Sequence, residues 1–493
     1  MSNFITLLPI VVFIFGMVGV GFYIQKKSEK DRSENYSKDY FIGGRSLGGF
    51  VLAMTLVATY GSVSSFVGGP GLAWARGFGW LYYASIQIAA AYLVLGVLGK
   101  KMAVIARRID AVTIPDLIRH RYQSNLLGTI AALVIVIFFS TQMVAQFIGG
   151  AKLFEAATGY SYLIGLVLFG VATIIYTSVG GFKAVAITDT ACAILMILGT
   201  ALIAGGLLQA GGGFENVMAT IRADAPELLD PFAGGLVTPA LLMSGWFLVG
   251  FGLVGLPQSA VRNMSFKSTQ AVHRAMIYGT VALGVMMVGM HLLGVLSRAV
   301  ITDTTITNTD SIMPMLVMQT LPPILAGIAI TGPLAASMST ISSLLIAARS
   351  ALVRDIYEFH LEKKNRKVDQ KKVSIISVAV TLVIGIIVFL FSIRPPDLIV
   401  WINLFAFGGL QTAFLWALLL GMFWKRANTT GALLSMVGGT GLYILLSAFN
   451  VSWFEMHNVV WGILFGLILF VAGSLATQPM DDRIGRLYFP ETY

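Results

Sequence analysis

The chain has 493 residues, of which 57% are hydrophobic and only 11% are charged. Soluble domains carry about 25% charged residues, so this composition predicts an all-α protein that crosses a membrane many times. The net charge of +10 at pH 7 does not indicate nucleic-acid binding, because the basic residues lie in loops between apolar stretches. The single cysteine, Cys192, excludes disulfide bonds within the chain.

The motifs that would support an enzyme or an ATP-driven pump are missing from the sequence. It has no phosphate-binding loop, nucleotide fingerprint or histidine-rich cluster. The lone intramembrane histidine, His291, is expected to be a packed, hydrogen-bonded residue rather than a ligand. We therefore predict neither catalysis nor ATP-driven pumping by this chain alone.

Thirteen apolar stretches are long enough to cross a bilayer, which requires about 20 mostly apolar residues per helix. The first, residues 4–24, has no Lys or Arg before it and no small-residue cleavage site before Lys26, so we expect a retained helix rather than a signal peptide. The predicted helices are centred near residues 14, 58, 90, 138, 169, 196, 248, 286, 335, 383, 409, 440 and 466.

The basic residues are distributed unevenly between the two sides of the predicted bundle. With the amino terminus outside, 28 of the 33 Lys and Arg residues fall on one side, mainly in loops 26–45, 100–121, 262–274 and 349–372. The positive-inside rule places that side, and the carboxyl terminus, in the cytoplasm. We predict a multi-pass protein of the cell membrane, which in bacteria is the inner membrane. Five basic residues are expected outside: Arg76, Lys152, Arg222, Arg298 and Arg394.

Two predicted spans contain glycine and proline where a continuous helix is unfavourable. In the second span Gly61 precedes a serine-rich stretch, and in the seventh Gly255 precedes Pro257. Such segments free backbone groups at membrane depth, where irregular backbone survives only against protein or a watery cavity. The spans are five apart, which predicts an inverted repeat of five plus five helices with the site at the breaks. Close packing on small residues is the alternative.

The predicted repeats organise residues 1–493 as one transporter domain. The first repeat covers residues 46–208, and the second covers residues 237–425. Residues 4–24 form an extra helix before the repeats, and residues 429–478 form two helices after them.

Residues 311–348 contain no charged residue, yet a hydroxyl cluster follows Gly332-Pro333, which is expected to interrupt this span. Hydroxyls in a membrane helix need helix-backbone acceptors, a neighbouring helix or a bound ion. On a helix, several of these oxygens can converge and bind a hard monovalent cation, namely those of Ser339, Thr340, Ser342 and Ser343.

Asp189 lies a few residues inside the sixth predicted span from its cytoplasmic end. A carboxylate within a membrane is costly and usually functional. We expect either an ion-binding carboxylate or a salt bridge at the membrane edge, for instance with Lys183.

Together, these segments resemble the sodium:solute symporter family over nearly the whole chain. The resemblance runs from residues 39–46, DYFIGGRS, to residues 421–432, which fit the family's carboxyl-terminal signature. The family's core has the inverted-repeat fold called LeuT-like, which the resemblance implies here. The stretches most like members that carry pantothenate are residues 53–56 with 58–60, 64–71, 255–257, 271–274 and 405–410.

The resemblance also implies residues that bind sodium. The main site would combine three backbone carbonyls and two hydroxyls, those of Ala58, Gly61, Ala336, Ser339 and Thr340. Some members bind a second sodium with an aspartate and serines, which match Asp189, Ser342 and Ser343. Three residues after that aspartate the family usually has a glutamine, whereas this chain has Cys192. We therefore expect one sodium per cycle.

The family's solute cavity is lined by the two broken spans and by the third, fourth and eleventh spans. The matching residues here are Ser62, Ser65, Gln87, Gln142, Gln146, Gly255 and Gln411. Any of these glutamines can instead join two helices by hydrogen bonds. Sugar-binding members have a carboxylate where this chain has Ala84, which disfavours a sugar. We expect no arginine deep in the membrane, so a solute carboxylate would meet sodium, amides or a helix N-terminus.

The resemblance implies sodium-coupled uptake of a small organic solute by alternating access, with Na⁺ as coupling ion and no other cofactor. Pantothenate is the expected solute, and a monocarboxylate, proline or a sugar is the alternative. The expected partners are this solute, sodium and membrane lipid, and not nucleic acid. A passive channel would need a continuous polar path. A transporter-like sensor would need an output domain, for which the segment after the last predicted span leaves no room.

Overall fold

The computed structural model describes residues 2–30, 45–179, 182–366, 368–394 and 399–490. Within these residues the chain is helical, without strands, and has one isolated bridge between Leu47 and Phe266. The predicted all-α fold is therefore confirmed. The motif at residues 39–46 lies mostly outside the described residues.

Within the described part of the chain, ten helices are long and apolar enough to cross a membrane, and a bent pair of segments makes eleven. Seven of them consist mainly of one long α-helix: α1 (Ser2–Lys30), α8 (Asn125–Thr158), α10 (Phe182–Ala210), α17 (Pro323–Leu352), α19 (Gln370–Ser392), α20 (Ile399–Phe423) and α23 (Asn458–Ala476). Two shorter apolar helices are α3 (Gly49–Tyr60) and α9 (Tyr162–Val179).

The other crossings consist of successive helical segments. These are α4 (Gly69–Ser85), α5 (Ala90–Tyr92) and α6 (Lys100–Arg108), then α12 (Pro239–Val249) and α13 (Pro257–Ala260), α14 (Thr269–Leu283) and α15 (Gly289–Leu296), and α21 (Thr429–Leu434) and α22 (Thr440–Ala448). α18 (Phe359–Lys363) extends the crossing of α17, and short helices outside the spans are α7 (Ile114–Tyr122), α11 (Phe214–Asp224), α16 (Ile312–Thr320) and α24 (Asp482–Tyr488).

Each of the thirteen predicted centres falls inside a helical segment of the structure. The apolar stretch Ser64–Arg108 joins the end of the second predicted crossing to the third, and its helix is divided at Gly77. Gly77 has a φ of 57°, and a Cβ there would lie 2.0 Å from the carbonyl oxygen of Leu228, so only glycine fits. The second and third predicted spans therefore meet at this residue.

The two predicted helix breaks are present. α3 ends at Tyr60, and the backbone of the next residue, Gly61, is extended with a φ of −66° and a ψ of 115°. α12 ends at Val249, and the chain continues from Gly250 through a 3₁₀ turn to Leu256 before α13 begins. The segments Pro239–Gly255 and Pro257–Met264 are bent by 46° relative to each other. Both spans thus carry irregular backbone at membrane depth.

The expected interruption at Gly332-Pro333 was wrong, because α17 runs through both residues as one helix. Proline removes only one helical hydrogen bond, and membrane helices tolerate this loss when neighbouring groups pack against the freed backbone. Here α10 supplies the neighbour: a Cβ on Gly199 would lie 2.9 Å from the carbonyl oxygen of Ala329, the residue four before Pro333. The small residues bring the two helices together instead of breaking one of them.

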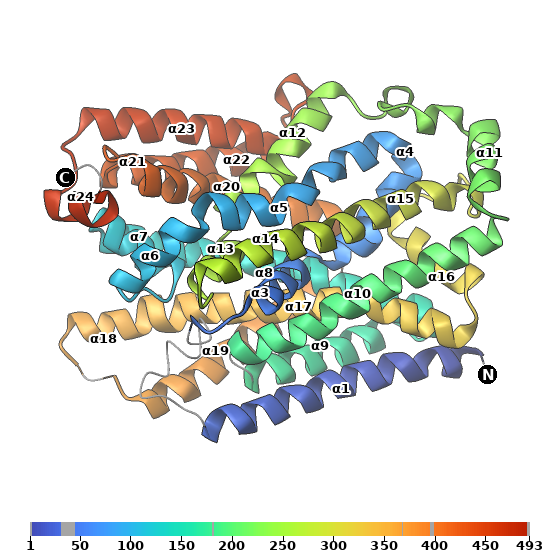
Figure 1. The fold of residues 1–493 in the computed structure, drawn as a ribbon, viewed down its shortest axis with the longest axis horizontal. Coiled ribbons are helices and arrows are strands. Elements are labelled where there is room, and N and C mark those ends of the chain that lie inside the picture. The colour runs from blue at the N-terminus through green and yellow to red at the C-terminus, as the bar shows by residue number, and fades with distance from the viewer. Residues whose placement is uncertain (1, 31–44, 180–181, 367, 395–398, 491–493) are drawn as a thin grey trace.

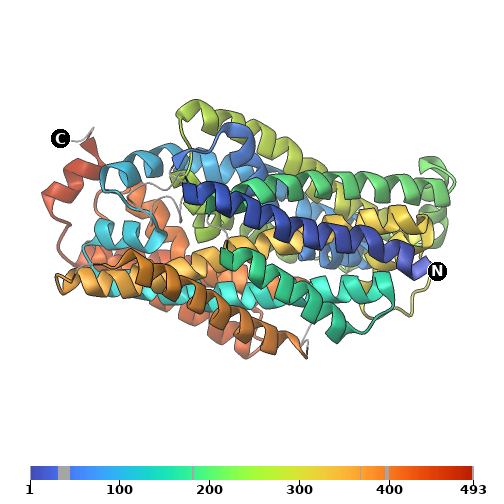
Figure 2. The same cartoon turned by 90° about the horizontal axis from the view of Figure 1, so that it is seen from below.

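The helices run along the long axis of the molecule, and the described chain begins and finishes at opposite ends of it (Figure 1). α17 lies inside the bundle and contacts α8, α10 and α1. α1 packs outside it, also against α9 and α10 (Figure 2). α3 contacts α14, α10 and α17, which places its broken end inside the bundle.

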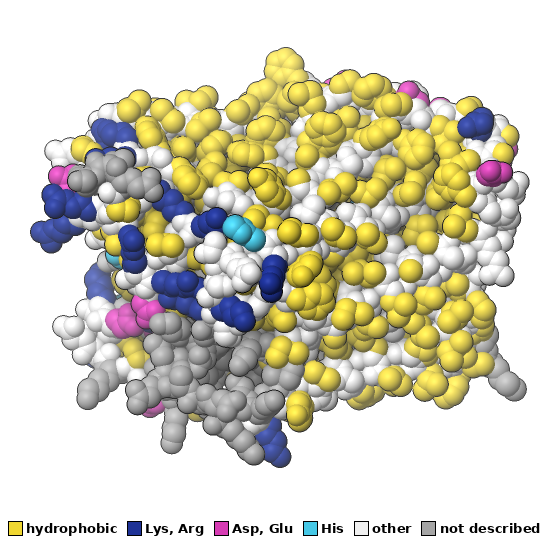
Figure 3. Space-filling model, viewed as in Figure 1, with side chains coloured by type: hydrophobic (Ala, Val, Ile, Leu, Met, Phe, Trp, Pro, Cys, Tyr) yellow, Lys and Arg dark blue, Asp and Glu magenta, His cyan; other side chains and the backbone are white. Residues whose placement is uncertain are grey.

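The surface divides into an apolar body and one basic end. Hydrophobic side chains cover most of the face in Figure 3, whereas Lys and Arg gather at the end where α6, α18 and α24 lie in Figure 1. Large apolar side chains such as Phe15, Ile137 and Ile468 are exposed, as a lipid-facing surface requires. The chain is therefore an integral membrane protein, with its basic loops at one end.

The charge distribution predicts which end faces the cytoplasm. Single cysteines placed at the exposed positions Lys364 and Asp303 should react with a membrane-impermeant thiol reagent from opposite sides, Asp303→Cys from outside in intact cells. The native Cys192 is buried and serves as the unreactive background. Labelling of both positions from outside would contradict the predicted topology.

Candidate functional site

The broken end of α3 faces the middle of α17. The last carbonyls of a helix have no partner within it, and here hydroxyls of α17 bond to them. Ser339 Oγ donates to the carbonyl oxygen of Ala58 at 2.9 Å and to that of Ala336 at 3.1 Å. Thr340 Oγ1 donates to the carbonyl oxygen of Gly61 at 3.2 Å. All five oxygens predicted for the main sodium site therefore lie together at one break.

Gly61 is the residue that permits this arrangement. A Cβ on it would lie 2.9 Å from Met286 Cε and 3.0 Å from the carbonyl oxygen of Val57. Its amide still donates to that Val57 carbonyl at 2.7 Å, so the helix stays closed up to the break. The carbonyls beyond this bond are free to turn toward α17.

The chemistry of this cluster suits a hard monovalent cation. Its ligands would be neutral oxygens from three carbonyls and two hydroxyls, and Ser339 and Thr340 are fully buried. In the described residues no group of three or more His, Cys, Asp or Glu side chains is placed to hold a metal ion. The same contacts also satisfy the hydroxyls as helix-to-helix hydrogen bonds, so sodium binding here stays a prediction.

The second predicted cation site centres on Asp189 of α10, which is also fully buried. Its Oδ2 accepts hydrogen bonds from Thr55 Oγ1 at 2.7 Å and from Ser343 Oγ at 3.4 Å. Ser342 Oγ instead donates to the carbonyl oxygen of Ser339 at 3.0 Å, on its own helix. The structure thus brings Asp189 and Ser343 together, whereas the hydroxyl of Ser342 bonds to the backbone of its own helix.

Arg262 is the residue that the sequence reasoning misplaced. It was assigned to a cytoplasmic loop, and no arginine was expected deep in the membrane, but Arg262 is only 2% exposed and its Nη2 lies 3.6 Å from Asp189 Oδ2. Arg262 lies in the segment Val261–Met264, which continues the broken seventh span. Because this segment contains polar residues, the apolar pattern gave no sign that Arg262 is buried. The salt bridge considered for Asp189 therefore exists with Arg262; the side chain of Lys183 lies outside the described residues.

A pocket beside the break contains three of the seven predicted solute-lining residues, Ser62, Ser65 and Gln87. Tyr60 also lines it and donates a hydrogen bond to Gln87 Oε1 at 3.0 Å. The described residues that line this pocket include no Asp, Glu, Lys or Arg, and His291 contributes an imidazole. The pocket therefore suits a solute whose polar groups are met by hydrogen bonds rather than by a side-chain ion.

The other four predicted lining residues lie outside this pocket and make contacts between helices. Gln146 Oε1 accepts from the amide of Val63 at 3.0 Å. Gln411 Nε2 donates to the carbonyl oxygen of Leu248 at 2.6 Å, and Gln142 Oε1 is 3.5 Å from the side-chain nitrogen of Gln258. A Cβ on Gly255 would lie 2.8 Å from the Cα of Leu415. These contacts hold the broken segments against α8 and α20.

The further residues that line the pocket, which were not predicted from the sequence, include Trp80, Tyr83, His291 and Asn403. The rings of Trp80 and Tyr83 stack with centroids 4.4 Å apart. His291 is packed and hydrogen bonded, as expected: its Nδ1 is 2.6 Å from the carbonyl oxygen of Met287. The sequence signal for these residues was the aromatic stretch around Trp80. Aromatic residues occur in many membrane helices, so this stretch did not identify a pocket.

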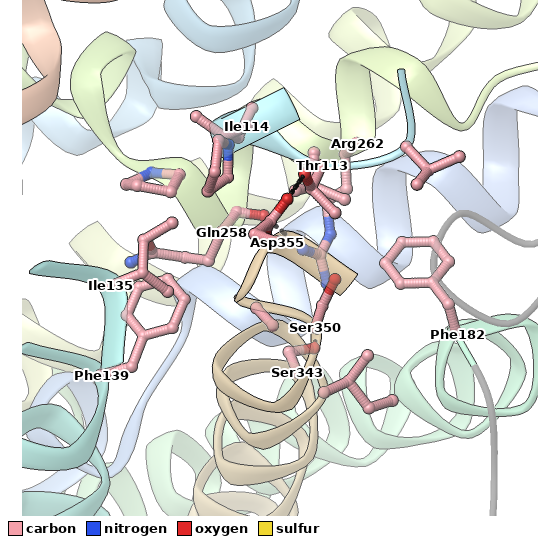
Figure 4. A pocket seen from close by; sticks show the side chains of 16 residues that line it. Thr113, Ile114, Ile135, Phe139, Phe182, Gln258, Arg262, Ser343, Ser350 and Asp355 are labelled. Carbon is pink, nitrogen blue, oxygen red and sulfur yellow. Dashed lines mark hydrogen bonds between the residues drawn. The ribbon is translucent and has the colours of Figure 1, made fainter. Parts of the chain in front are cut away.

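A second cavity is lined in part by residues 112–115 and by Ser350 and Asp355, which belong to the loops predicted to be cytoplasmic (Figure 4). Its polar lining residues include Thr113, Gln258, Arg262, Ser343 and Asp355. Thr113 Oγ1 donates to Asp355 Oδ1 at 2.5 Å, the dashed contact in Figure 4. The two cavities share no lining residue. Tyr60 and Ser62, on either side of the break at Gly61, line the first cavity, whereas Arg262 and Ser343 line the second.

Residues 40–439 match the model of the sodium:solute symporter family. The chain belongs to this family. Sodium/pantothenate symporters of Haemophilus influenzae and Escherichia coli are each 42% identical to the symporter described here over 469 residues, which is 95% of this chain and 96% of each relative. The sodium/proline symporter of Escherichia coli is 29% identical over 482 residues, covering 95% of this chain and 92% of the relative.

The fold of this symporter is that of a solved sodium-coupled transporter. A structure of a Na⁺-coupled sialic acid symporter matches it with a TM-score of 0.79 at 20% identity, covering 98% of this chain and 100% of that one. A nucleobase-cation-symport-1 family transporter matches with a TM-score of 0.55 at 12% identity, over 92% of this chain and 99% of that one. The predicted LeuT-like fold is thereby confirmed.

The oxygen cluster at the break gives a direct test of the main sodium site. Ser339→Ala and Thr340→Ala should each raise the sodium concentration for half-maximal uptake about 5- to 150-fold, because each loses an interaction of about 1 to 3 kcal/mol. Sodium-dependent uptake of labelled solute into vesicles measures this change.

Ser337→Ala is the matched control for these variants. Ser337 is a buried hydroxyl of the same helix, but its Oγ donates to the carbonyl oxygen of Gln146 at 2.8 Å and not to a carbonyl of the predicted sodium site. Its sodium dependence should stay close to that of the wild type. Unchanged sodium dependence in both Ser339→Ala and Thr340→Ala would mean that the cluster only joins helices.

Proposed function

We propose that this protein takes up pantothenate together with sodium by alternating access. The observation that carries the proposal is the 42% identity to two sodium/pantothenate symporters over 95% of the chain. The site is consistent with this activity, because it pairs a cluster of neutral oxygens with an adjacent pocket free of fixed carboxylates. Sodium is the coupling ion and pantothenate the solute.

Coupling between the two follows from the break in α3. The carbonyl of Gly61 belongs to the proposed sodium site, and the next residue, Ser62, lines the solute pocket. Sodium bound to the carbonyls of Ala58 and Gly61 fixes the backbone of the break, and with it the position of Ser62. The ion therefore shapes the pocket that the solute enters.

The pocket offers pantothenate polar partners without a side-chain cation. Pantothenate has a carboxylate, an amide and two hydroxyl groups. In the described part of the chain, three buried polar atoms of the pocket make no hydrogen bond to protein: Ser64 Oγ, Trp80 Nε1 and Asn403 Oδ1. Buried polar atoms usually have a partner, and a bound solute would supply it. We assign them to the amide, hydroxyl and carboxylate groups of the solute.

The orientation and repeat boundaries belong to the same proposal. The amino terminus faces outside and the carboxyl terminus faces the cytoplasm, which puts the basic end of Figure 3 inside the cell. The repeats comprise residues 46–208 and 237–425, and the cavity of Figure 4 then faces the cytoplasm. In this arrangement the solute pocket and the cytoplasmic cavity lie on either side of the broken segments.

Uptake of labelled solute tests the proposal. In proteoliposomes with an inward sodium gradient, we expect labelled pantothenate to accumulate, and unlabelled pantothenate to compete far better than proline, sugars or short monocarboxylates. Without the gradient, pantothenate should no longer accumulate above its external concentration. A passive channel would not concentrate the solute under either condition. Sodium-driven uptake of proline with none of pantothenate would refute the assignment and favour the solute of the 29% identical relative.

The tryptophan of the pocket gives a test of solute recognition. Trp80→Phe keeps an aromatic ring but removes the Nε1 donor, so it should raise the KM for pantothenate about 10- to 150-fold, the effect of losing a hydrogen bond of about 1.5 to 3 kcal/mol to a charged group. The sodium dependence should stay unchanged.

Trp74→Phe is the control for this variant, because Trp74 Nε1 donates to the carbonyl oxygen of Ile301 at 2.9 Å, outside the pocket. It should leave the KM near the wild-type value. A KM that moves equally in both variants would show that Trp80 acts through packing and not through its donor.

A further inference from the structure

The guanidinium of Arg262 occupies a nest of oxygens. Its Nη2 donates to Thr55 Oγ1 and to Ser343 Oγ, each at 3.1 Å, and to Thr59 Oγ1. Asp189 Oδ2 lies 3.6 Å from the same nitrogen. Three hydroxyls and one carboxylate thus surround one nitrogen of the positively charged guanidinium, as ligands surround a bound cation.

The side chain is held in this position from several directions. Its Nη1 donates to the carbonyl oxygen of Gln258 at 2.6 Å, and its guanidinium carbon lies 5.6 Å from the centre of the Phe182 ring. Figure 4 shows Arg262 extending from the segment after α13 toward Ser343 on α17, with Phe182 to one side. The oxygens come from α3, α10 and α17, so the guanidinium connects all three helices to the broken seventh span.

The charges at this position balance without another ion. Arg262 and Asp189 are both almost fully buried, and a buried charge is tolerated when an opposite charge and hydrogen bonds accompany it. A sodium ion beside Asp189 would add a second positive charge within a few ångströms of the guanidinium. It would also compete for Asp189 Oδ2 and Ser343 Oγ, which already accept or donate hydrogen bonds.

The main oxygen cluster is different in this respect. Its five oxygens come from carbonyls and hydroxyls, and the hydroxyls donate only to backbone oxygens there. No arginine or lysine takes part in these described contacts. A sodium ion can therefore bind to this cluster without displacing a charged group.

We propose that Arg262 is the resident cation of the second site, so that the carrier binds and moves a single sodium ion per solute. This inference rests on the proposed sodium-coupled transport. It assigns Asp189 the role of counter-ion to a protein side chain rather than of ligand to a transported ion. Asp189 Oδ1, which has no hydrogen-bond partner among the described residues, marks where a second sodium could bind if the guanidinium were removed.

Counting bound sodium tests this inference on the purified protein. Equilibrium binding of radioactive sodium should give one ion per wild-type protein, two for Arg262→Gln, and one again for the double variant Arg262→Gln with Asp189→Asn. Arg262→Lys keeps the positive charge and should bind one. Arg349→Gln removes another buried arginine of the bundle, whose Nη1 donates to Thr381 Oγ1 at 3.3 Å, and should also bind one.

Transport provides a second readout. Pantothenate is a monovalent anion, so uptake with one sodium is electroneutral and should not respond to a potassium-diffusion potential. For a two-sodium carrier, a potential of about 100 mV would increase accumulation nearly 50-fold. Arg262→Gln should gain this response, and the double variant should lose it.

The outcomes separate this inference from the proposed function. Two sodium ions bound to the wild type, or one bound to Arg262→Gln, would overturn it. If Arg262→Gln does not fold, the wild type and Asp189→Asn decide: one ion in both supports the inference, and loss of an ion in Asp189→Asn overturns it. The count needs no solute, so a failure of pantothenate uptake would refute the proposed function and leave the count standing.

Discussion

The site depends on one constraint, which is that backbone carbonyls inside a membrane need partners. A continuous helix meets this need by itself, and α3 gives it up at Gly61. The freed carbonyls then require hydroxyls from another helix or a cation. α17 supplies Ser339 and Thr340 at the required depth, so the break and the hydroxyl cluster explain each other. Neither would be stable in the bilayer without the other.

The same constraint applies to charge. A lone Asp189 within the bundle would be very costly, and so would a lone Arg262; together they form a neutral pair with hydroxyls around it. The pair lies one helix turn from the main oxygen cluster along α17, at Ser343 compared with Ser339. Two neighbouring positions on one helix thus meet different demands, one with neutral oxygens and the other with an internal ion pair.

Much of this arrangement could be predicted because it leaves a trace in composition. Apolar runs locate the crossings, and glycine with proline locates the breaks at Gly61 and before Pro257. Hydroxyls without charges locate the oxygen cluster on α17. Each of these signals is local, since a few adjacent residues contain it.

The remaining features depend on contacts between distant segments. Pro333 interrupts an isolated helix, but Gly199 of α10 packs beside it, and nothing near Pro333 in the sequence reveals that neighbour. Arg262 lies in a stretch that reads as a loop, and only its proximity to Asp189, 73 positions earlier, makes it a buried ion. The wall of the pocket combines Trp80 and Asn403 from crossings far apart in the chain. Such pairs exist only once the helices have packed.

The continuity of Gly61 and Ser62 has a thermodynamic consequence. If sodium at Gly61 raises the affinity for solute at Ser62 by some factor, the solute must raise the affinity for sodium by the same factor, because the coupling free energy is shared. The apparent sodium affinity of the carrier is then not a fixed constant. It would rise with the supply of solute, so a cell in sodium-poor surroundings could still load the ion wherever the nutrient is abundant.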